Sequence, residues 1–90
     1  MLFEFDSNKS CSNKVKHGID FIEAQCLWDD ESLIEIPAHT VDEPRYLVIG
    51  VMENKHYSAV IIYREENIRI ISVRRSHEKE VDIYESKRVR

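Results

Sequence analysis

The chain has 90 residues, of which 42% are hydrophobic and 33% are charged, and its formal net charge is −4 at pH 7. This length predicts a single domain spanning residues 1–90. No apolar run approaches the roughly 20 residues of a membrane helix, and the N-terminus lacks the basic start and apolar middle of a signal peptide. We therefore expect a cytoplasmic protein with no membrane partner. Two cysteines are too few for a disulfide framework, so Cys11 and Cys26 are interpreted as small buried hydrophobic residues.

The N-terminal segment predicts a short strand followed by a helix. Residues 2–5 alternate well enough for a strand. Residues 7–17 follow as a helix, for which Asp6 or Ser7 is a suitable N-cap. Gly18 suits the left-handed conformation in which many helices end.

Side chains of this first helix separate into two faces when successive residues are placed about 100° apart. One face is polar and cationic and carries Lys9, Asn13, Lys16 and His17. Cys11 and Val15 lie on the other face, which we expect to contact the core. Helix-end chemistry alone also accounts for Lys16 and His17, because cations are favoured at a helix C-terminus. The sequence leaves this structural alternative open beside a functional one.

The rest of the chain alternates between strand and helix signals. The predicted elements are a helix over residues 20–28, strands over 33–36, 45–52, 56–64 and 68–75, and a helix over 77–88. The last three strands are rich in β-branched and aromatic residues, and the short gaps between them favour hairpins. The β-α-α-β-β-β-β-α order predicts an α+β fold in which helices pack on a small antiparallel sheet.

Acidic and basic residues are segregated along the sequence. Between Gly18 and Pro44 there are eight acidic residues and no Lys or Arg, so all 13 basic residues lie outside this block. The net charge of −4 therefore does not describe the surface as a whole. Such polarity allows the chain to bind an anion on one side and a basic partner on another.

Arginines cluster in the last predicted strand. Strict alternation places Arg69 and Arg75 on one face of this strand and Arg74 on the other. Arg69 lies between isoleucines, where a charge needs a partner. One interpretation is an ion pair with Glu80 or Glu43. The other is phosphate recognition, because a guanidinium is a rigid cation that matches phosphate oxygens.

Together with these arginines, the cationic helix face suits metal-free RNA cleavage. In this reaction a base activates the ribose 2′-hydroxyl, an acid protonates the leaving 5′-oxygen, and cations stabilise the phosphorane. Histidine exchanges protons near neutral pH, so His17 is the candidate for either proton-transfer role.

The other three histidines are interpreted as solvated or capping side chains: His39, His56 and His77. No histidine pair has the spacing of metal ligands, and the acidic run at residues 29–31 lacks the alternation of a calcium loop. We therefore expect no metal site and no cofactor.

The order and spacing of these residues resemble a known family along nearly the whole chain. The chain resembles BrnT, the ribonuclease toxin of a bacterial type II toxin–antitoxin pair. The residues that carry the resemblance are Phe5-Asp6, Asn8-Lys9, Asn13, Lys16-His17-Gly18, Phe21, Ala24, Glu43, Arg45, Gly50, Arg69-Ile70-Ile71-Ser72, Arg74-Arg75, Glu80 and Tyr84.

This resemblance implies a RelE-like ribonuclease fold and a metal-independent endoribonuclease that stops translation. It also implies neutralisation by a BrnA-like ribbon-helix-helix antitoxin, with operator DNA bound only through that antitoxin. Joined to the chemistry above, it assigns catalysis to His17, Lys9 and Arg69, and contacts with RNA phosphates to Lys16, Arg45, Arg74 and Arg75. Two alternatives stay open: a non-catalytic partner subunit of a DNA-bound toxin–antitoxin repressor, and a small protein-interaction module.

Overall fold

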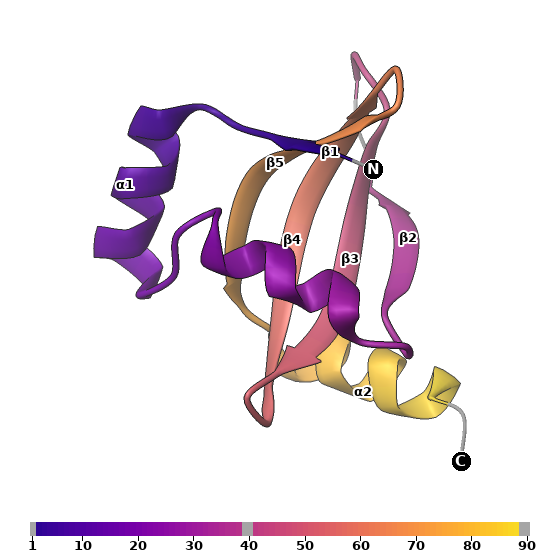
Figure 1. The fold of residues 1–90 in the computed structure, drawn as a ribbon. Helices are drawn as coiled ribbons and strands as arrows, with labels where there is room; N and C mark the ends of the chain where they lie inside the picture. Colours follow the sequence, from indigo (N-terminus) through magenta and orange to yellow (C-terminus); the bar gives the residue numbers. More distant parts are fainter. Residues whose placement is uncertain (1, 39–40, 89–90) are drawn as a thin grey trace.

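A computed structural model describes residues 2–38 and 41–88, and His39 therefore lies outside the described residues. Its elements, in chain order, are β1 (Leu2–Glu4), α1 (Ser7–His17), η1 (Glu23–Asp29), β2 (Ile34–Ala38), β3 (Arg45–Met52), β4 (Lys55–Arg64), β5 (Asn67–Arg75) and α2 (Glu78–Lys87). The strands form one five-stranded sheet in the order β1-β5-β4-β3-β2 (Figure 1). The α+β class predicted from the sequence is confirmed.

The sheet differs from the prediction in one pairing and one helix. β2, β3, β4 and β5 pair antiparallel, but β1 pairs with β5 in parallel. The long connection that a parallel pair requires is supplied by the elements between β1 and β5. The second helix, η1, is a 3₁₀-helix rather than an α-helix. The chain just before η1 is fixed by Asp20, whose Oδ1 accepts hydrogen bonds from the backbone N–H groups of Ile22 and Glu23.

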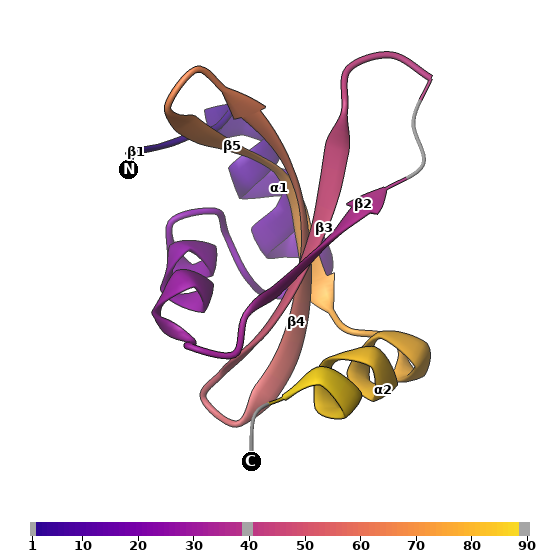
Figure 2. The same cartoon turned by 90° about the vertical axis from the view of Figure 1, so that its right-hand side faces the viewer.

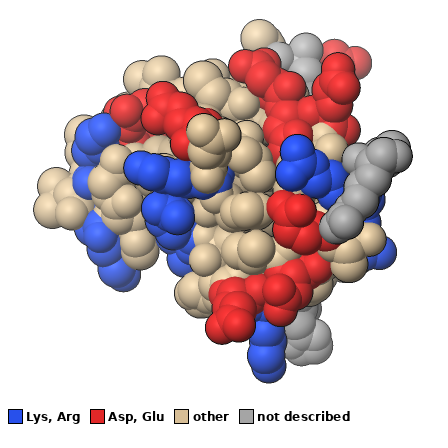
Figure 3. All heavy atoms as spheres, turned by 90° about the horizontal axis from the view of Figure 1, so that it is seen from below, with Lys and Arg blue, Asp and Glu red and all other residues tan. Residues whose placement is uncertain are grey.

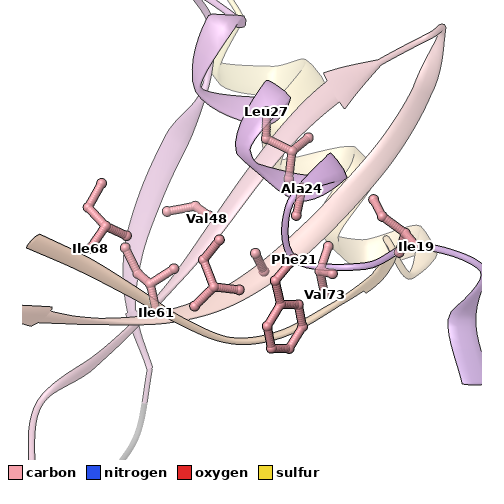
Figure 4. Close-up of a cluster of buried hydrophobic side chains, with 10 residues drawn as sticks. Ile19, Phe21, Ala24, Leu27, Val48, Ile61, Ile68 and Val73 are labelled. Carbon is pink, nitrogen blue, oxygen red and sulfur yellow. The ribbon is translucent and has the colours of Figure 1, made fainter. Parts of the chain in front are cut away.

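The main hydrophobic core lies between η1 and one face of the sheet. Its residues are Ile19, Phe21, Ala24, Leu27, Val48, Ala59, Ile61, Ile68, Ile70 and Val73, and several of them are labelled in Figure 4. Each of these side chains is at most 3% exposed. The 18–27 segment and the strands thus bury one apolar surface between two layers, as expected for a helix on a sheet.

α2 packs on the opposite side of the sheet from η1, as the turned view shows (Figure 2). Tyr84 of α2 is 1% exposed, and its hydroxyl donates a 2.7 Å hydrogen bond to Asp30 Oδ2. The same oxygen accepts a 2.8 Å hydrogen bond from the backbone N–H of Val51 in β3. Asp30 therefore ties the end of η1 to both the sheet and α2.

The orientation of α1 contradicts part of the sequence analysis. Its ends are as predicted: Asp6 Oδ1 accepts hydrogen bonds from the first turn, and Gly18 adopts the left-handed conformation with φ +77°. The buried residues, however, are Ser10 and Asn13, whereas Val15 is 89% exposed. Neither cysteine is buried, because Cys11 lies on the outer side of α1 and Cys26 on the outer side of η1.

Within residues 2–38 and 41–88, none of the helices is long and apolar enough to cross a membrane.

Candidate nucleic-acid interface

The amide of Asn13 fixes α1 to the edge of β5. Asn13 Nδ2 donates 2.8 Å hydrogen bonds to the carbonyl oxygens of Val73 and Ile19, and Oδ1 accepts one of 3.3 Å from the N–H of Val73. A side-chain amide carries the same donor and acceptor as a peptide group, so Asn13 occupies the place of a neighbouring strand. The helical pattern of the sequence had predicted that this residue lies on the solvent-exposed cationic face.

The anchored helix presents its two lysines to one side of the sheet. Ser10 Oγ accepts a 2.9 Å hydrogen bond from the backbone of Phe21, so this flank of α1 faces the η1 layer. Lys9 and Lys16 lie on the other flank, about 40° and 60° from Asn13 around the helix axis. Both are exposed, and they border the sheet face that lies away from η1.

A β-bulge in β5 changes the faces on which its arginines lie. Val60 pairs with Ser72 but Ile61 pairs with Ile70, which leaves Ile71 without a partner. The extra residue shifts the alternation by one, so Arg69 and Arg74 share the face away from η1. Strict alternation had placed them on opposite faces, and that prediction is wrong.

Arg45 lies on the same sheet face. The next residue, Tyr46, is the cross-strand partner of Ile61, which in turn pairs with Ile70, and these side chains point toward η1. Arg45 therefore belongs to the row of Arg69, two strand spacings away, which is about 10 Å between their backbones. Three arginines from two strands thus lie on the sheet face that Lys9 and Lys16 border.

Two of these arginines are held by carboxylates. Arg69 Nη1 lies 3.8 Å from Glu4 Oε2 on the neighbouring β1. Arg74 makes two 2.8 Å hydrogen bonds, one to each carboxylate oxygen of Glu80. The ion-pair interpretation of Arg69 is confirmed, but its partner is Glu4. The two partners expected for it bind other arginines: Glu80 binds Arg74, and Glu43 binds Arg64.

Glu80 organises the junction between β5 and α2. Its Oε1 also accepts 2.8 Å hydrogen bonds from Ser58 Oγ and from the backbone N–H of His77. The Arg74 guanidinium, together with these donors, lowers the pKa of Glu80 from 4.5 to about 2. The carboxylate therefore stays charged, and Arg74 is fixed in place with both terminal nitrogens engaged.

His17 and Arg75 are the last residues of α1 and β5. His17 is the last residue of α1, one turn beyond Asn13, and its side chain is exposed. Arg75 ends β5, two residues beyond Val73, and its guanidinium carbon lies 5.7 Å above the ring centre of Tyr57. Arg75 and Tyr57 are cross-strand partners, so Arg75 projects on the η1 side, away from Arg74.

The predicted site residues therefore form two groups. Residues on or beside the sheet face away from η1 are Lys9, Lys16, Arg45, Arg69 and Arg74. His17 and Arg75 lie at the lower end of α1 and β5. Arg69 and Arg75 are six residues apart, about 20 Å along a strand, so the structure does not bring Arg69 beside His17. Seen from below, Lys and Arg side chains gather on the α1 side, at the left of Figure 3.

The remaining histidines have structural surroundings. His56 Nε2 lies 2.8 Å from Glu85 Oε2, and its ring packs edge-on against Tyr84. The backbone of His77 caps α2 through Glu80. Among the described residues, no group of three or more His, Cys, Asp or Glu side chains is arranged to hold a metal ion.

Tyr57 was not among the predicted site residues, because the sequence marks it only as part of a strand. Its neighbours Arg75 and the segment after α1 come from distant parts of the chain, so no local pattern marks it. The role of Glu80 was also missed, although its position three residues after His77 is the spacing of a capping box.

Two comparisons with known proteins bear on this surface. The model of a family described as "Ribonuclease toxin, BrnT, of type II toxin-antitoxin system" matches residues 5–80. The comparison with curated proteins found no match. The matched range includes α1, the whole sheet from β2 to β5 and Glu80.

Proposed function

Since the chain belongs to the BrnT family of ribonuclease toxins of type II toxin–antitoxin systems, we propose that it is a metal-independent endoribonuclease that inhibits translation. The observation that supports this best is that cations from α1, β3 and β5 lie on or beside one face of the sheet, with His17 at the end of α1. Phosphate binding depends on such a cationic surface. Eight of the 17 acidic residues lie in a different segment, residues 20–43, which contains no Lys or Arg.

The proposed roles follow from exposure and pairing. The side chains of Lys9, Lys16 and His17 are exposed, and within residues 2–38 and 41–88 they form no ion pair or hydrogen bond. They are therefore available to a ligand. We assign proton transfer to His17 and stabilisation of the phosphorane charge to Lys9 and Lys16.

The arginines have more distant or partly structural roles in this proposal. We assign Arg75, which lies two residues beyond the Val73 that Asn13 contacts, to binding a phosphate beside His17. Arg69 and Arg45 bind the RNA backbone farther along the sheet face rather than the reacting phosphate. Arg74, whose guanidinium is occupied by Glu80, positions this end of β5 and adds positive charge.

We further propose that residues 1–90 form one RelE-like domain that acts in the cytoplasm, where its RNA substrate is translated. Its antitoxin is proposed to be a BrnA-like ribbon-helix-helix protein, and operator DNA is bound only through that antitoxin. An antitoxin that covers Lys9, Lys16 and His17 would block RNA by occupying the same cations.

The test is cleavage of a single-stranded RNA in EDTA by protein freed from its antitoxin. We expect cleavage by the wild type and a loss of about 100-fold or more in His17→Ala, the usual range for removing a general acid or base. Lys87→Ala is the matched control, because Lys87 is an exposed cation in the last turn of α2.

Three results would contradict the proposal. Equal cleavage by His17→Ala and wild type removes the assigned proton-transfer residue. Cleavage that requires added metal removes the metal-independent mechanism. A wild type that binds its antitoxin but never cleaves RNA supports the non-catalytic partner subunit instead.

A further inference from the structure

A cavity of about 530 Å³ opens directly beside the end of α1. It lies between the segment that follows α1 and the hairpin of β3 and β4, and its lining residues are Gly18, Ile19, Glu23, Cys26, Met52, Glu53, Lys55 and Tyr57. Gly18 directly follows His17 in the chain. The cavity therefore begins one residue from the proposed proton-transfer group.

The cavity is lined by an aromatic ring, and a guanidinium outside the lining residues packs on that ring. Tyr57 is half-buried and packs against the core, which fixes the orientation of its ring. Arg75 lies over that ring. Flat aromatic rings and guanidinium planes are the surfaces on which unstacked RNA bases bind.

The polar groups around the cavity suit a base that is attached to a phosphate. Lys55 on the hairpin lines the cavity, and Arg75 supplies a second positive charge through its position over Tyr57. Glu53 on the same hairpin also lines the cavity and adds a negative charge. Glu23 in the wall is paired with Lys14 at 2.7 Å, so its charge is compensated within the protein. Met52, which is half-buried, supplies apolar contact area for the flat face of a base.

We propose that this cavity is a nucleobase subsite that binds the base next to the scissile phosphate by stacking it on Tyr57. The inference rests on the proposed function, because it places the phosphate of that nucleotide at His17. Tyr57 is then a substrate-positioning residue that fixes where the RNA backbone passes α1. The ligand class is a base of single-stranded RNA, since a paired base is stacked within its duplex and does not enter such a cavity.

Binding of cleavage-resistant RNA tests the subsite separately from catalysis. The probe is a labelled 2′-O-methyl RNA oligonucleotide, prepared intact and as a series with one abasic residue at successive positions, and the readout is fluorescence anisotropy. A stacked base contributes roughly 1–3 kcal/mol, so its removal should weaken binding by about 5- to 150-fold. We expect this loss at one position of the series with the wild-type protein.

Variants at Tyr57 assign that loss to the ring. Tyr57→Leu should bind the intact probe as weakly as the wild type binds the abasic probe with the largest loss of affinity. Its affinity should also be the same for every probe in the abasic series. Tyr57→Phe keeps the ring and should restore both properties. Tyr46→Leu is the matched control, because Tyr46 is also half-buried but contacts Tyr63 at the far end of the sheet.

The outcomes separate this inference from the proposed nuclease activity. If Tyr57→Leu is folded and binds the intact probe like the wild type, or if it responds to the abasic series as the wild type does, the subsite is refuted. Absence of wild-type binding to any probe also refutes it. A protein that shows the expected binding pattern but never cleaves RNA retains the subsite and contradicts only the nuclease.

Discussion

Removing the amide of Asn13 is expected to destabilise the protein more than any change of the exposed residues of α1. The amide makes three hydrogen bonds to backbone groups of Val73 and Ile19, and Asn13 itself is 8% exposed. In Asn13→Ala these backbone groups lose their partners while the valine and isoleucine stay at most 3% exposed.

The magnitude follows from the number and setting of these bonds. One hydrogen bond contributes about 0.5–1.5 kcal/mol net, and a buried group left without a partner costs about 1–3 kcal/mol. Three bonds that share one side chain do not add fully, so we expect a loss of about 3 kcal/mol in the free energy of unfolding for Asn13→Ala. That is a large share of the roughly 5–15 kcal/mol that stabilises a typical domain.

Urea unfolding followed by circular dichroism measures this loss. Asn8→Ala is the matched control, since Asn8 carries the same amide on an exposed position of the first turn, and it should change stability by no more than about 0.5 kcal/mol. Asn13→Asp keeps the acceptor for Val73 but loses both donors, so it should also be strongly destabilised. Equal stability of Asn13→Ala and Asn8→Ala would refute the anchoring role of the amide.

Two further predictions concern Glu80 and Gly18. The pKa of Glu80 is about 2 in the folded protein and ordinarily 4.5, so its contribution to stability is complete above about pH 4.5 and is lost as the pH falls toward 2. Glu80→Gln should lower the melting temperature at neutral pH and should reduce the change of melting temperature between pH 4.5 and pH 2. The exposed control Glu78→Gln should do neither. Parallel plots of melting temperature against pH for the wild type and Glu80→Gln would contradict this prediction. Gly18→Ala should lower the free energy of unfolding in urea by about 1 kcal/mol, because φ is +77° there. No atom lies within 4 Å of an added Cβ, so this backbone strain is the whole expected cost. Gly18→Asn should cost less, and unchanged stability of Gly18→Ala would contradict the prediction.

Local signals in the sequence were sufficient for most elements. The helix over residues 7–17 and the strand over 45–52 match the structure, and the neighbouring strands differ from their predicted bounds by one or two residues. These elements have strong local causes: an Asp N-cap and a Gly end for α1, and runs of β-branched residues for the strands. The 3₁₀ geometry of η1 has no comparable sequence signal, since its capping residues also suit an α-helix.

Features that depend on distant partners were not predictable in this way. Asn13 is buried because the edge of β5 supplies its hydrogen-bonding partners 60 residues later. That contact also turns Val15 to solvent, although apolar periodicity had assigned it to the core. The bulge beside Ile71 arises from the pairing of β4 with β5 and reverses the expected face of Arg74. The residue types of the candidate site could therefore be predicted from the sequence, but their arrangement in space could not.

The short pairing of β1 has a consequence for how the protein avoids self-association. β1 covers only Asn67–Arg69 of β5, and farther along the strand the polar groups of Val73 are taken by Asn13. An open strand edge recruits strands from other chains and promotes aggregation. The helix that carries His17 thus also blocks strand addition at this part of the β5 edge, so detachment of α1 would dismantle the candidate RNA site and expose an aggregation-prone edge in the same event.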